Sequence, residues 1–394
     1  MSSATKKSLL FVNGHLNTGG IEKTLVDLLA VIDYDRYDVD LLLLQGLGDY
    51  ADRVHSRVKI LSFDVRDTYG PLLQSLKRSI ISRHYALVVF RLVILISKFV
   101  GSGALCLLRP ILPVRKKYDC AIAYRTGFCA EVVAYSVKAD KKLCWWHNGE
   151  FNYDVRGKAV VGRLLSSFTG IVAVSEGWKN RLSKEFPTLS SRINVMYNIL
   201  DSRQLELSSS EFPLEFKGVD YPIVSVGNLT FRKHFDNIVY VVKKLLEDGI
   251  NNFRWFIIGD GEEFTHISNL ISLSAVGDHI LMLGKRTNPY PYVRNAKLYV
   301  HPSYGEAHCT AILEAMALRT PCVVTETFVP QDFTHSGINC IEVSRDPQAL
   351  YAGVLEMMKN PLKAEKMTDY AYMQVISDYS PEVISGSFYT IIEK

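Results

Sequence analysis

The chain has 394 residues, of which 48% are hydrophobic and 22% are charged, and its formal net charge is +4. This length exceeds what one hydrophobic core usually supports, and the composition excludes a disordered chain, so two folded domains are expected. The seven cysteines lie in mostly apolar runs without a paired or metal-binding spacing. Reduced core thiols are therefore predicted, and a disulfide framework is not.

The first half of the chain alternates apolar strands with helices. Residues 8–12 predict a buried strand, 13–20 a glycine-rich loop and 21–32 a helix, and 38–44 and 58–63 are expected to form the next strands. This order predicts a parallel sheet. The N-terminus leads directly into the first strand and not into a signal peptide, so a cytoplasmic protein is expected.

Two short motifs in this half have opposite interpretations. Gly19 and Gly20 would let the backbone approach a phosphate closely, although a plain turn is an equally good reading of these residues alone. Asp38 and Asp40 match an Asp-x-Asp metal motif, but four leucines follow them directly. We interpret this pair as the start of a strand and predict no metal site.

Residues 74–117 contain no Asp or Glu but carry nine basic residues: Lys77, Arg78, Arg83, Arg91, Lys98, Arg109, Arg115, Lys116 and Lys117. The rest of the chain has 45 − 9 = 36 basic against 41 acidic residues, a net charge of −5. Arg91 and Lys98 interrupt the apolar runs, which are too short to span a bilayer. The segment predicts an interfacial amphipathic helix on an anionic membrane surface. The alternative is a buried helix pair with a solvated basic face.

Three further strands are expected at 118–124, 142–146 and 170–174, and the second ends at His147. A histidine at the carboxyl end of a strand is well placed to line a cleft. The serine-rich and proline-containing stretch 201–220 predicts a linker.

A second run of strands begins after the linker, at 223–226, 255–258 and 280–283. The turn after the first of them carries Arg232 and Lys233, which could neutralise a diphosphate. Gly284 and Lys285 end the third strand and are expected to face a nucleobase. The remaining strands are predicted at 296–301, 322–324 and 340–343, and the tail from 381 to 394 is expected to be helical.

The turn and helix after 296–301 form the most informative stretch. Glu306 lies in the turn, and Glu314 lies eight positions further on, inside a helix predicted at 310–318. The N–H groups near Cys309, Thr310 and Ala311 at the helix start suit a phosphate. A diphosphate there, with a carboxylate on either side to accept hydroxyl hydrogen bonds, matches a nucleoside diphosphate sugar. The plainer alternative is that Glu306 caps the helix and Glu314 is solvated.

The two glutamates, followed by Ala315-Met316-Ala317 and Thr320-Pro321-Cys322-Val323-Val324, resemble the donor-binding element of glycosyltransferase family 4. Gly19-Gly20-Ile21-Glu22 matches the Gly-Gly-x-Glu loop of that family. His147 matches the family's histidine near the donor sugar, and Lys233 matches the lysine in the turn after the first strand of the second domain. Asn228 and His234 depart from the family, which has arginine and glycine at these positions. Arg232 is the candidate to replace the missing arginine.

The resemblance implies the GT-B fold: two α/β, Rossmann-like domains facing a central cleft, with a C-terminal helix crossing back to the first domain. The expected acceptor-binding domain is 1–200, the linker 201–220, the nucleotide-sugar domain 221–378 and the returning helix 379–394.

The implied activity is transfer of a sugar, most simply from a UDP-linked donor, to a hydroxyl of a lipid-linked or polysaccharide acceptor in cell-envelope glycan synthesis. Retention at the anomeric carbon is implied, with no metal or other cofactor required. The expected location is peripheral, on the inner face of the cell membrane, and no nucleic-acid partner is expected.

Within that site the candidate catalytic residues are Glu306, His147 and Lys233. The candidate donor-binding residues are Gly19, Gly20, Arg232, Lys233, Gly284, Lys285, Cys309, Thr310, Ala311 and Glu314. A sugar epimerase or a phosphorylase on the same fold, and a catalytically degenerate membrane-docked subunit of a polysaccharide complex, are the alternatives.

Overall fold

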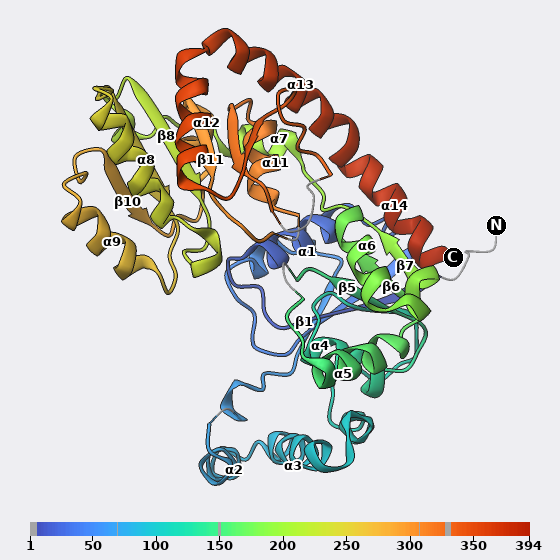
Figure 1. Cartoon of the computed structure of the whole chain (residues 1–394). Helices are drawn as coiled ribbons and strands as arrows, with labels where there is room; N and C mark the ends of the chain where they lie inside the picture. Colours follow the sequence, from blue (N-terminus) through green and yellow to red (C-terminus); the bar gives the residue numbers. More distant parts are fainter. Residues whose placement is uncertain (1–5, 69, 149–150, 307, 328–331) are drawn as a thin grey trace. The chain divides into compact units, whose positions relative to one another are not determined.

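The structure of the chain is a computed structural model that describes residues 6–68, 70–148, 151–306, 308–327 and 332–394. It contains two units, one formed by Met1–Asn198 with Ser385–Lys394 and the other by Ile199–Ile384. Each unit is built on its own parallel sheet, so the two-domain α/β architecture expected from the sequence is confirmed (Figure 1).

Unit 1 contains a seven-stranded sheet in the order β3-β2-β1-β4-β5-β6-β7. Its strands are β1 (Lys7–Asn13), β2 (Tyr37–Leu43), β3 (Lys59–Ser62), β4 (Tyr118–Ala123), β5 (Ala139–Trp146), β6 (Gly170–Ala173) and β7 (Ile193–Val195). Its helices are α1 (Gly20–Ala30), α2 (Leu72–Ile81), α3 (Tyr85–Val100), α4 (Phe128–Glu131), α5 (Val155–Ser166) and α6 (Glu176–Glu185). The strands are almost continuous apolar runs because helices cover a parallel sheet on both faces.

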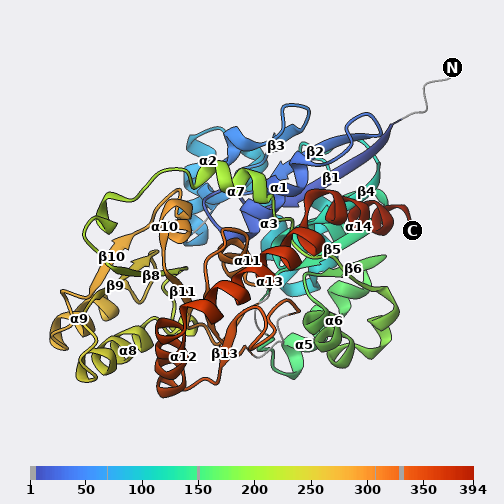
Figure 2. The ribbon, with the colours of Figure 1, turned by 90° about the horizontal axis from the view of Figure 1, so that it is seen from above.

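Unit 2 contains a six-stranded sheet in the order β10-β9-β8-β11-β12-β13. Its strands are β8 (Tyr221–Val226), β9 (Phe253–Ile258), β10 (Ile280–Gly284), β11 (Leu298–His301), β12 (Cys322–Thr325) and β13 (Ile341–Val343). Its helices are α7 (Ser202–Ser208), α8 (Asp236–Glu247), α9 (Phe264–Leu273), α10 (Tyr290–Asn295), α11 (Thr310–Ala317), α12 (Pro347–Lys359) and α13 (Pro361–Tyr379). Figure 2 shows α8, α9 and α12 on one face of this sheet and α10 and α11 on the other.

The predicted linker at 201–220 is not a separate connector. It clusters with unit 2 and contains the helix α7, which packs on α10 and α11. Asp201 caps this helix, since its carboxylate accepts a hydrogen bond from the backbone N–H of Gln204 at 2.9 Å. The serine-rich composition had suggested a flexible segment, but the cap and the apolar Leu205 stabilise a helix there instead.

The last helix, α14 (Pro381–Glu393), returns the chain to unit 1. Phe388 is buried against Phe11 and Trp145, with ring centroids 6.1 and 6.3 Å apart. Lys141 Nζ donates to the carbonyl oxygen of Ile392 at 2.8 Å. The C-terminal residues are therefore part of the core of unit 1.

Both sheets have a switch point, where the chain leaves one strand, fills one half of the sheet and then returns to the other side of that strand. In unit 1 this point lies between β1 and β4, and in unit 2 it lies between β8 and β11. In open α/β sheets, ligands bind outside the carboxyl ends of the strands at such a point. These two pairs of strands are therefore where a ligand is expected.

Candidate functional site

An ion pair lies at the switch point of unit 2. The short helix Phe231–Lys233 follows β8, and the loop that contains Glu306 follows β11. Lys233 Nζ donates a hydrogen bond to Glu306 Oε1, and the two side chains are 19% and 10% exposed. Two residues that are 73 positions apart in the sequence are thus joined at the sheet edge where ligands bind.

Both members of this pair are charged. Burial disfavours the ammonium group of Lys233, but the Glu306 carboxylate outweighs it and raises the pKa of Lys233. Burial likewise opposes ionisation of Glu306, but Lys233 and His301 hold the pKa of that carboxyl well below its usual range. The site therefore presents a fixed cation beside a fixed anion.

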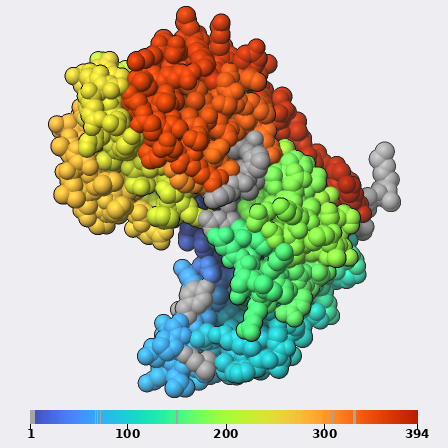
Figure 3. All heavy atoms as spheres, in the orientation of Figure 1, coloured from blue at the N-terminus to red at the C-terminus, as the bar shows by residue number. Residues whose placement is uncertain are grey.

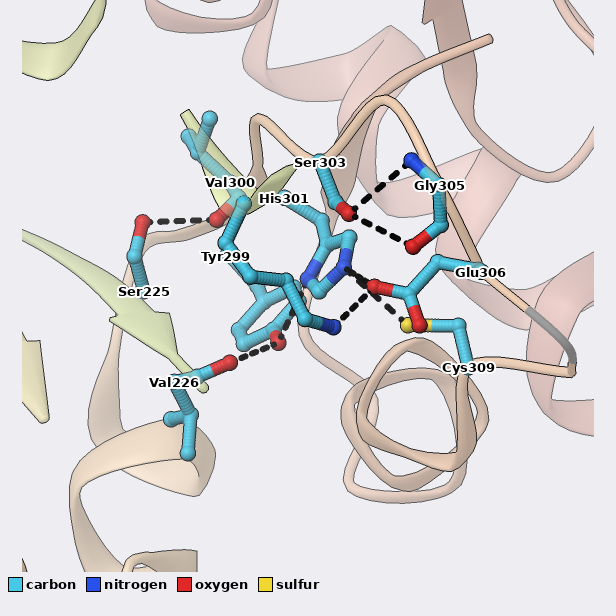
Figure 4. Close-up of polar contacts among 10 residues, drawn as sticks. Ser225, Val226, Tyr299, Val300, His301, Ser303, Gly305, Glu306 and Cys309 are labelled. Atoms are coloured by element: carbon cyan, nitrogen blue, oxygen red, sulfur yellow. Dashed lines mark hydrogen bonds and ion pairs between the residues drawn. The ribbon is translucent and has the colours of Figure 1, made fainter. Parts of the chain in front are cut away.

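His301, the last residue of β11, contacts the same oxygen of Glu306 (Figure 4). Its Nε2 lies 2.7 Å from Glu306 Oε1, and its Nδ1 lies 3.3 Å from the hydroxyl of Tyr299. Burial is the main cause that lowers the pKa of His301, so the ring is neutral. A carboxylate only accepts hydrogen bonds, which assigns the single imidazole proton to Nε2.

Cys309 precedes α11 and has a left-handed backbone, with φ 46°. Such a conformation is uncommon for a residue with a side chain and often marks a functional position. The Cys309 Sγ lies 3.2 Å from His301 Nε2. Thr310 and Ala311 are the first two residues of α11, whose first-turn N–H groups have no acceptor within the helix itself.

Glu314 lies one turn further along α11 and is buried. The hydroxyl of Tyr290, the first residue of α10, donates to Glu314 Oε1 at 3.0 Å. The carboxylate is therefore held by a neighbouring helix and is not solvated, which rules out the plain alternative for this residue.

Tyr304 connects the two loops that carry Lys233 and Glu306. Its backbone N–H donates to the carbonyl oxygen of Arg232 at 3.1 Å, and its ring lies 3.8 Å from the ring of His234. Asn237 Nδ2 donates to the Tyr304 hydroxyl at 3.0 Å. His234 has φ 47°, so the position where the related family has glycine keeps the left-handed backbone that favours glycine. Arg232 itself is exposed.

Glycines fix the neighbouring loops of unit 2. A Cβ at Gly259 would lie 1.8 Å from the carbonyl oxygen of Gly227, and one at Gly261 would lie 2.3 Å from that of Leu229. The loops after β8 and β9 can approach this closely only without side chains. Gly284 ends β10 with φ 67°, and Lys285 after it is exposed.

Of the candidate residues of unit 1, Gly19 and Gly20 lie at its own switch point, and His147 lies one strand further along the sheet. Gly19 precedes α1 and Gly20 is its first residue, and a Cβ at Gly19 would come within 2.5 Å of Glu22 Oε2. Glu22 is buried and accepts a hydrogen bond at 3.1 Å from Arg125 Nη1, which follows β4. His147 follows β5, and its ring lies 4.8 Å from that of Tyr124.

The Asp-x-Asp pair has structural contacts. Asp40 is buried in β2, where it accepts a hydrogen bond from the Tyr118 hydroxyl at 2.6 Å and lies 3.1 Å from Lys116 Nζ. Asp38 is exposed and lies 3.9 Å from Lys6 Nζ. Asp38 and Asp40 are two residues apart, so their side chains face the same side of the sheet. They differ in exposure because Asp38 lies near the start of β2.

Sequence reasoning missed several partners in these sites. His301, Tyr290 and Tyr304 each contact a residue of the candidate site, and Arg125 pairs with Glu22. The one signal for His301 was a polar residue at the end of an otherwise apolar strand, five positions before Glu306. Ala307, which lies within the predicted motif, falls outside the described residues.

Comparison with known proteins relates part of the chain to a family of enzymes. Residues 209–374 match the family of glycosyl transferases group 1. The N-acetyl-alpha-D-glucosaminyl L-malate synthase of Bacillus anthracis is 22% identical over 56% of this chain and 58% of its own length. The lipopolysaccharide core biosynthesis glycosyltransferase LpsE of Rhizobium meliloti is 26% identical over 44% of this chain and 50% of its own length. The chain spans about half the length of the curated relatives it matches first.

A longer match joins this chain to an N-acetylgalactosaminyltransferase of Campylobacter jejuni that acts on a diphospho-undecaprenol substrate, with 22% identity over 79% of this chain and 78% of that protein. Among solved structures, Anabaena HepE in complex with UDP and glucose has a TM-score of 0.74 at 14% identity, over 98% of this chain and 99% of HepE. TarM, from S. aureus, has a TM-score of 0.74 at 13% identity over the whole of both chains. The chain therefore has the GT-B fold, and its residues 209–374 match the family of glycosyl transferases group 1.

Proposed function

We propose that the chain transfers a sugar from a UDP-linked donor to a hydroxyl of a lipid-linked or polysaccharide acceptor, with retention at the anomeric carbon. The observation that carries this proposal is the Lys233–Glu306 pair at the β8–β11 switch point, with Glu314 buried eight positions further on. The UDP in the HepE complex and the diphospho-undecaprenol substrate named for the Campylobacter relative support the donor and acceptor classes.

The mechanism we propose is stabilisation of the leaving group. When the bond between the anomeric carbon and the diphosphate oxygen breaks, the electron pair stays with the diphosphate. The acceptor hydroxyl oxygen forms the new bond to the sugar, and its proton passes to the departing diphosphate. Lys233 carries a positive charge that is already held in place, so it can meet the growing negative charge without reorganising. The N–H groups at the start of α11 would add to this effect.

The two glutamates have different proposed partners. Glu306 would accept hydrogen bonds from hexose hydroxyls, and Glu314 would accept them from ribose hydroxyls, with Tyr290 keeping its carboxylate in place. His301 would act as a positioning residue, because it is buried and donates to Glu306. We still propose the roles predicted from the sequence for His147, Gly19, Gly20, Arg232 and Lys285.

A mixture of nucleotide sugars, incubated with the chain and a membrane extract, tests the activity. We expect mass spectrometry to show consumption of one UDP-sugar and a lipid or glycan product heavier by one sugar residue, and Glu306→Gln should not form it. A UDP-induced rise in melting temperature would separate a donor-binding enzyme from a degenerate subunit. Binding of no nucleotide and consumption of no donor would contradict the proposal.

No metal is required in the proposed reaction, because a lysine and helix N–H groups are available for the diphosphate. Glu306 Oε1 also already accepts from Lys233 and His301, so a hard divalent cation would compete with two donors for that oxygen. We expect transfer to persist in EDTA. Loss of activity in EDTA that Mg²⁺ or Mn²⁺ restores would overturn this part.

We also propose that α2 and α3 dock unit 1 on an anionic membrane. No helix among the described residues is both long and apolar enough to cross a bilayer. Along α3, exposed apolar side chains recur at intervals of four and three residues, namely Tyr85, Val89, Leu92, Ile96 and Phe99. Leu87, Phe90 and Val93 occupy the buried face of the same helix. These helices are coloured light blue to cyan in the space-filling view (Figure 3).

The charges around this stripe favour a lipid surface over a second copy of the chain. Lys77, Arg78, Arg83 and Lys98 are exposed on α2 and α3 and in their connection, and no acid lies between 74 and 117. Two copies facing each other here would bring basic residues together. The nine basic residues are not equally available, however: Lys116 contacts Asp40, Lys117 contacts Asp140, and Arg91 donates to the carbonyl oxygen of Gly70.

Flotation with anionic vesicles tests this docking. Each basic residue near such a surface contributes about 1 kcal/mol, so changing Lys77, Arg78, Arg83 and Lys98 to Gln should weaken binding by up to roughly a thousandfold. A matched control loses the same charge from exposed residues of unit 2, by changing Lys217, Lys243, Lys359 and Lys366 to Gln. Equal flotation of the two variants, or dimerisation of the parent instead of flotation, would refute docking.

A further inference from the structure

Three metal-ligating side chains converge beside Lys233. Among the described residues, His301, Glu306 and Cys309 offer one nitrogen, one oxygen and one sulfur atom that all lie within 4.8 Å of one another (Figure 4). The donor chemistry proposed above uses Glu306 and assigns His301 only to hold it in place, and it gives no role to the Cys309 thiol at contact distance from that imidazole. The presence of that thiol requires another explanation.

We propose that His301, Glu306 and Cys309 bind a zinc-class cation, and that this cation inhibits sugar transfer by taking Glu306 away from Lys233. Thiolate and imidazole ligands select Zn²⁺ and similar borderline-soft ions over Mg²⁺. Three protein ligands with a fourth position open to water or substrate are a common arrangement for such an ion. The inhibition rests on the proposed function, but the binding of the cation does not.

The geometry requires the three side chains to adjust around the ion. In a tetrahedral zinc site, bond lengths of about 2.0–2.3 Å place a nitrogen roughly 3.3 Å from an oxygen and roughly 3.6 Å from a sulfur. The observed separations are 2.7 Å from His301 Nε2 to Glu306 Oε1 and 3.2 Å from the same nitrogen to Cys309 Sγ. Opening each by about half an ångström would admit the ion, provided that the Glu306 carboxylate and Cys309 Sγ, which lie within 4.8 Å of each other, also settle at roughly 3.6 Å. Cys309 combines a left-handed backbone with a sulfur that lies against the His301 ring.

The protons can be accounted for. Cys309 Sγ releases one proton to solvent and becomes a thiolate, and the imidazole proton of His301 moves from Nε2 to Nδ1. That proton then points at the hydroxyl of Tyr299, 3.3 Å away, and the hydroxyl can donate to the carbonyl oxygen of Val226 at 3.3 Å. Metal-bound histidines usually donate their other ring N–H in this way, so the outer hydrogen bonds of the site are already in place.

Occupation of the site would change the two charges that matter for transfer. Glu306 Oε1 would coordinate the cation and could no longer accept from Lys233 or from a hexose hydroxyl. The ammonium group of Lys233 would be repelled by a divalent charge in its place. The free chain would then be active, and the metal-bound chain inactive.

Cobalt titration of the full metal-free chain tests the binding directly, since Co²⁺ replaces Zn²⁺ and absorbs light when a thiolate coordinates it. We expect one equivalent of Co²⁺ to produce the thiolate charge-transfer band, Zn²⁺ to remove it, and Mg²⁺ to leave it unchanged. Cys309→Ser should lack the band. Cys106→Ser is the matched control, because Cys106 is the exposed thiol that would bind cobalt adventitiously.

A second measurement guards against a misfolded variant and separates the two proposals. Zn²⁺ should raise the melting temperature of the parent chain and of Cys106→Ser, but not of Cys309→Ser, and it should inhibit transfer at a concentration at least about tenfold lower in the parent than in Cys309→Ser. Absence of the band in the parent, or its loss in Cys106→Ser alone, would overturn the metal site. A band in a chain that binds no UDP would refute only the proposed function.

Discussion

The two sheets have the same strand order around their switch points, but the charges there are arranged in opposite ways. In unit 1 the acid, Glu22, follows the first strand of the switch and the base, Arg125, follows the second. In unit 2 the base, Lys233, follows the first strand and the acid, Glu306, follows the second. In each unit the two charged partners are about 70 to 100 residues apart in the sequence.

The difference lies in what remains available to a ligand. In unit 1 the base is 38% exposed and the acid 5%, and the acid has a second neighbour in His15 at 3.7 Å. In unit 2 both partners are mostly buried, and Glu306 is held further by His301. A buried ion pair that can be reached from a ligand site is a stronger electrostatic element than a half-exposed one, because water screens it less. We therefore expect the pair in unit 2 to control chemistry and the pair in unit 1 to stabilise a loop.

The largest expected effect is on turnover. Glu306→Gln keeps the shape of the side chain but loses the charge, and we expect sugar transfer to fall by about a hundredfold or more while UDP still binds, as for other preorganised groups in active sites. Glu22→Gln removes the matched acid of unit 1 and should reduce transfer far less. Steady-state rates with the native donor decide the matter. Equal losses in the two variants would remove the distinction between the two sites.

The next effect is on nucleotide affinity. Losing a charged hydrogen bond costs about 1.5–3 kcal/mol, so Lys233→Ala and Glu314→Ala should each weaken UDP binding by roughly ten- to a hundredfold. Arg125→Ala removes the matched cation of unit 1 and should change the affinity by no more than about fivefold, since a half-exposed pair contributes about 1 kcal/mol at most. Calorimetric titration with UDP measures all three. Parent-like affinity in Lys233→Ala would contradict the proposed donor site.

Acid should destabilise unit 2. Burial lowers the pKa of His308 to about 3 and also lowers the pKa of His301. The unfolded chain, in which a histidine has a pKa of about 6.5, binds more protons below that pH, so folded stability decreases as the pH falls from about 6.5 toward 3.

For His308 alone the loss between pH 6.5 and 4.5 is about 2–3 kcal/mol, at 1.4 kcal/mol for each pH unit. The depressed pKa of Glu306 adds its own loss only below about 4.5, where the unfolded carboxyl would take up a proton. Urea unfolding at pH 7, 6 and 5 measures the slope. His308→Gln should flatten it, and an equal slope in that variant would show that other groups are responsible.

The smallest expected effect comes from His234→Gly. Glycine removes a strain of about 1 kcal/mol at a left-handed position, and the variant also loses a ring contact with Tyr304 worth about 0.5–1.5 kcal/mol. The two contributions nearly cancel, so the free energy of unfolding should change by less than about 1 kcal/mol. Equilibrium unfolding of the variant measures this. A loss several times larger would show that the ring contact sets the position of the Lys233 loop.

The strands and helices could be predicted from the sequence because their signals lie within short stretches of residues. The strands before Lys233 and Glu306 are short apolar runs that end at turns, and these two residues could be assigned to one site from their positions after the strands. Tyr290 and Arg125 could not be assigned, since their contacts depend on where α10 and the loop after β4 place long side chains.

The net charge of segment 74–117 could be predicted from the sequence, but which of its basic residues pair with acids could not. The acid-free segment was recognisable from composition, yet Lys116 and Lys117 contact Asp40 and Asp140, which precede and follow the segment in the sequence. The linker prediction at 201–220 failed for a related reason. Serine favours loops on average, but a single aspartate cap and one buried leucine are enough to form α7.

The return of α14 to unit 1 decides how chimeric enzymes should be cut. The simplest exchange of unit 2 between relatives is a single crossover that replaces everything after residue 198. In this chain such an exchange would also replace Phe388, whose ring packs on Phe11 and Trp145, together with the carbonyl group of Ile392 that Lys141 contacts. A graft bounded at 199 and 384 keeps those residues with their native core, so recombination here requires two crossover points and not one.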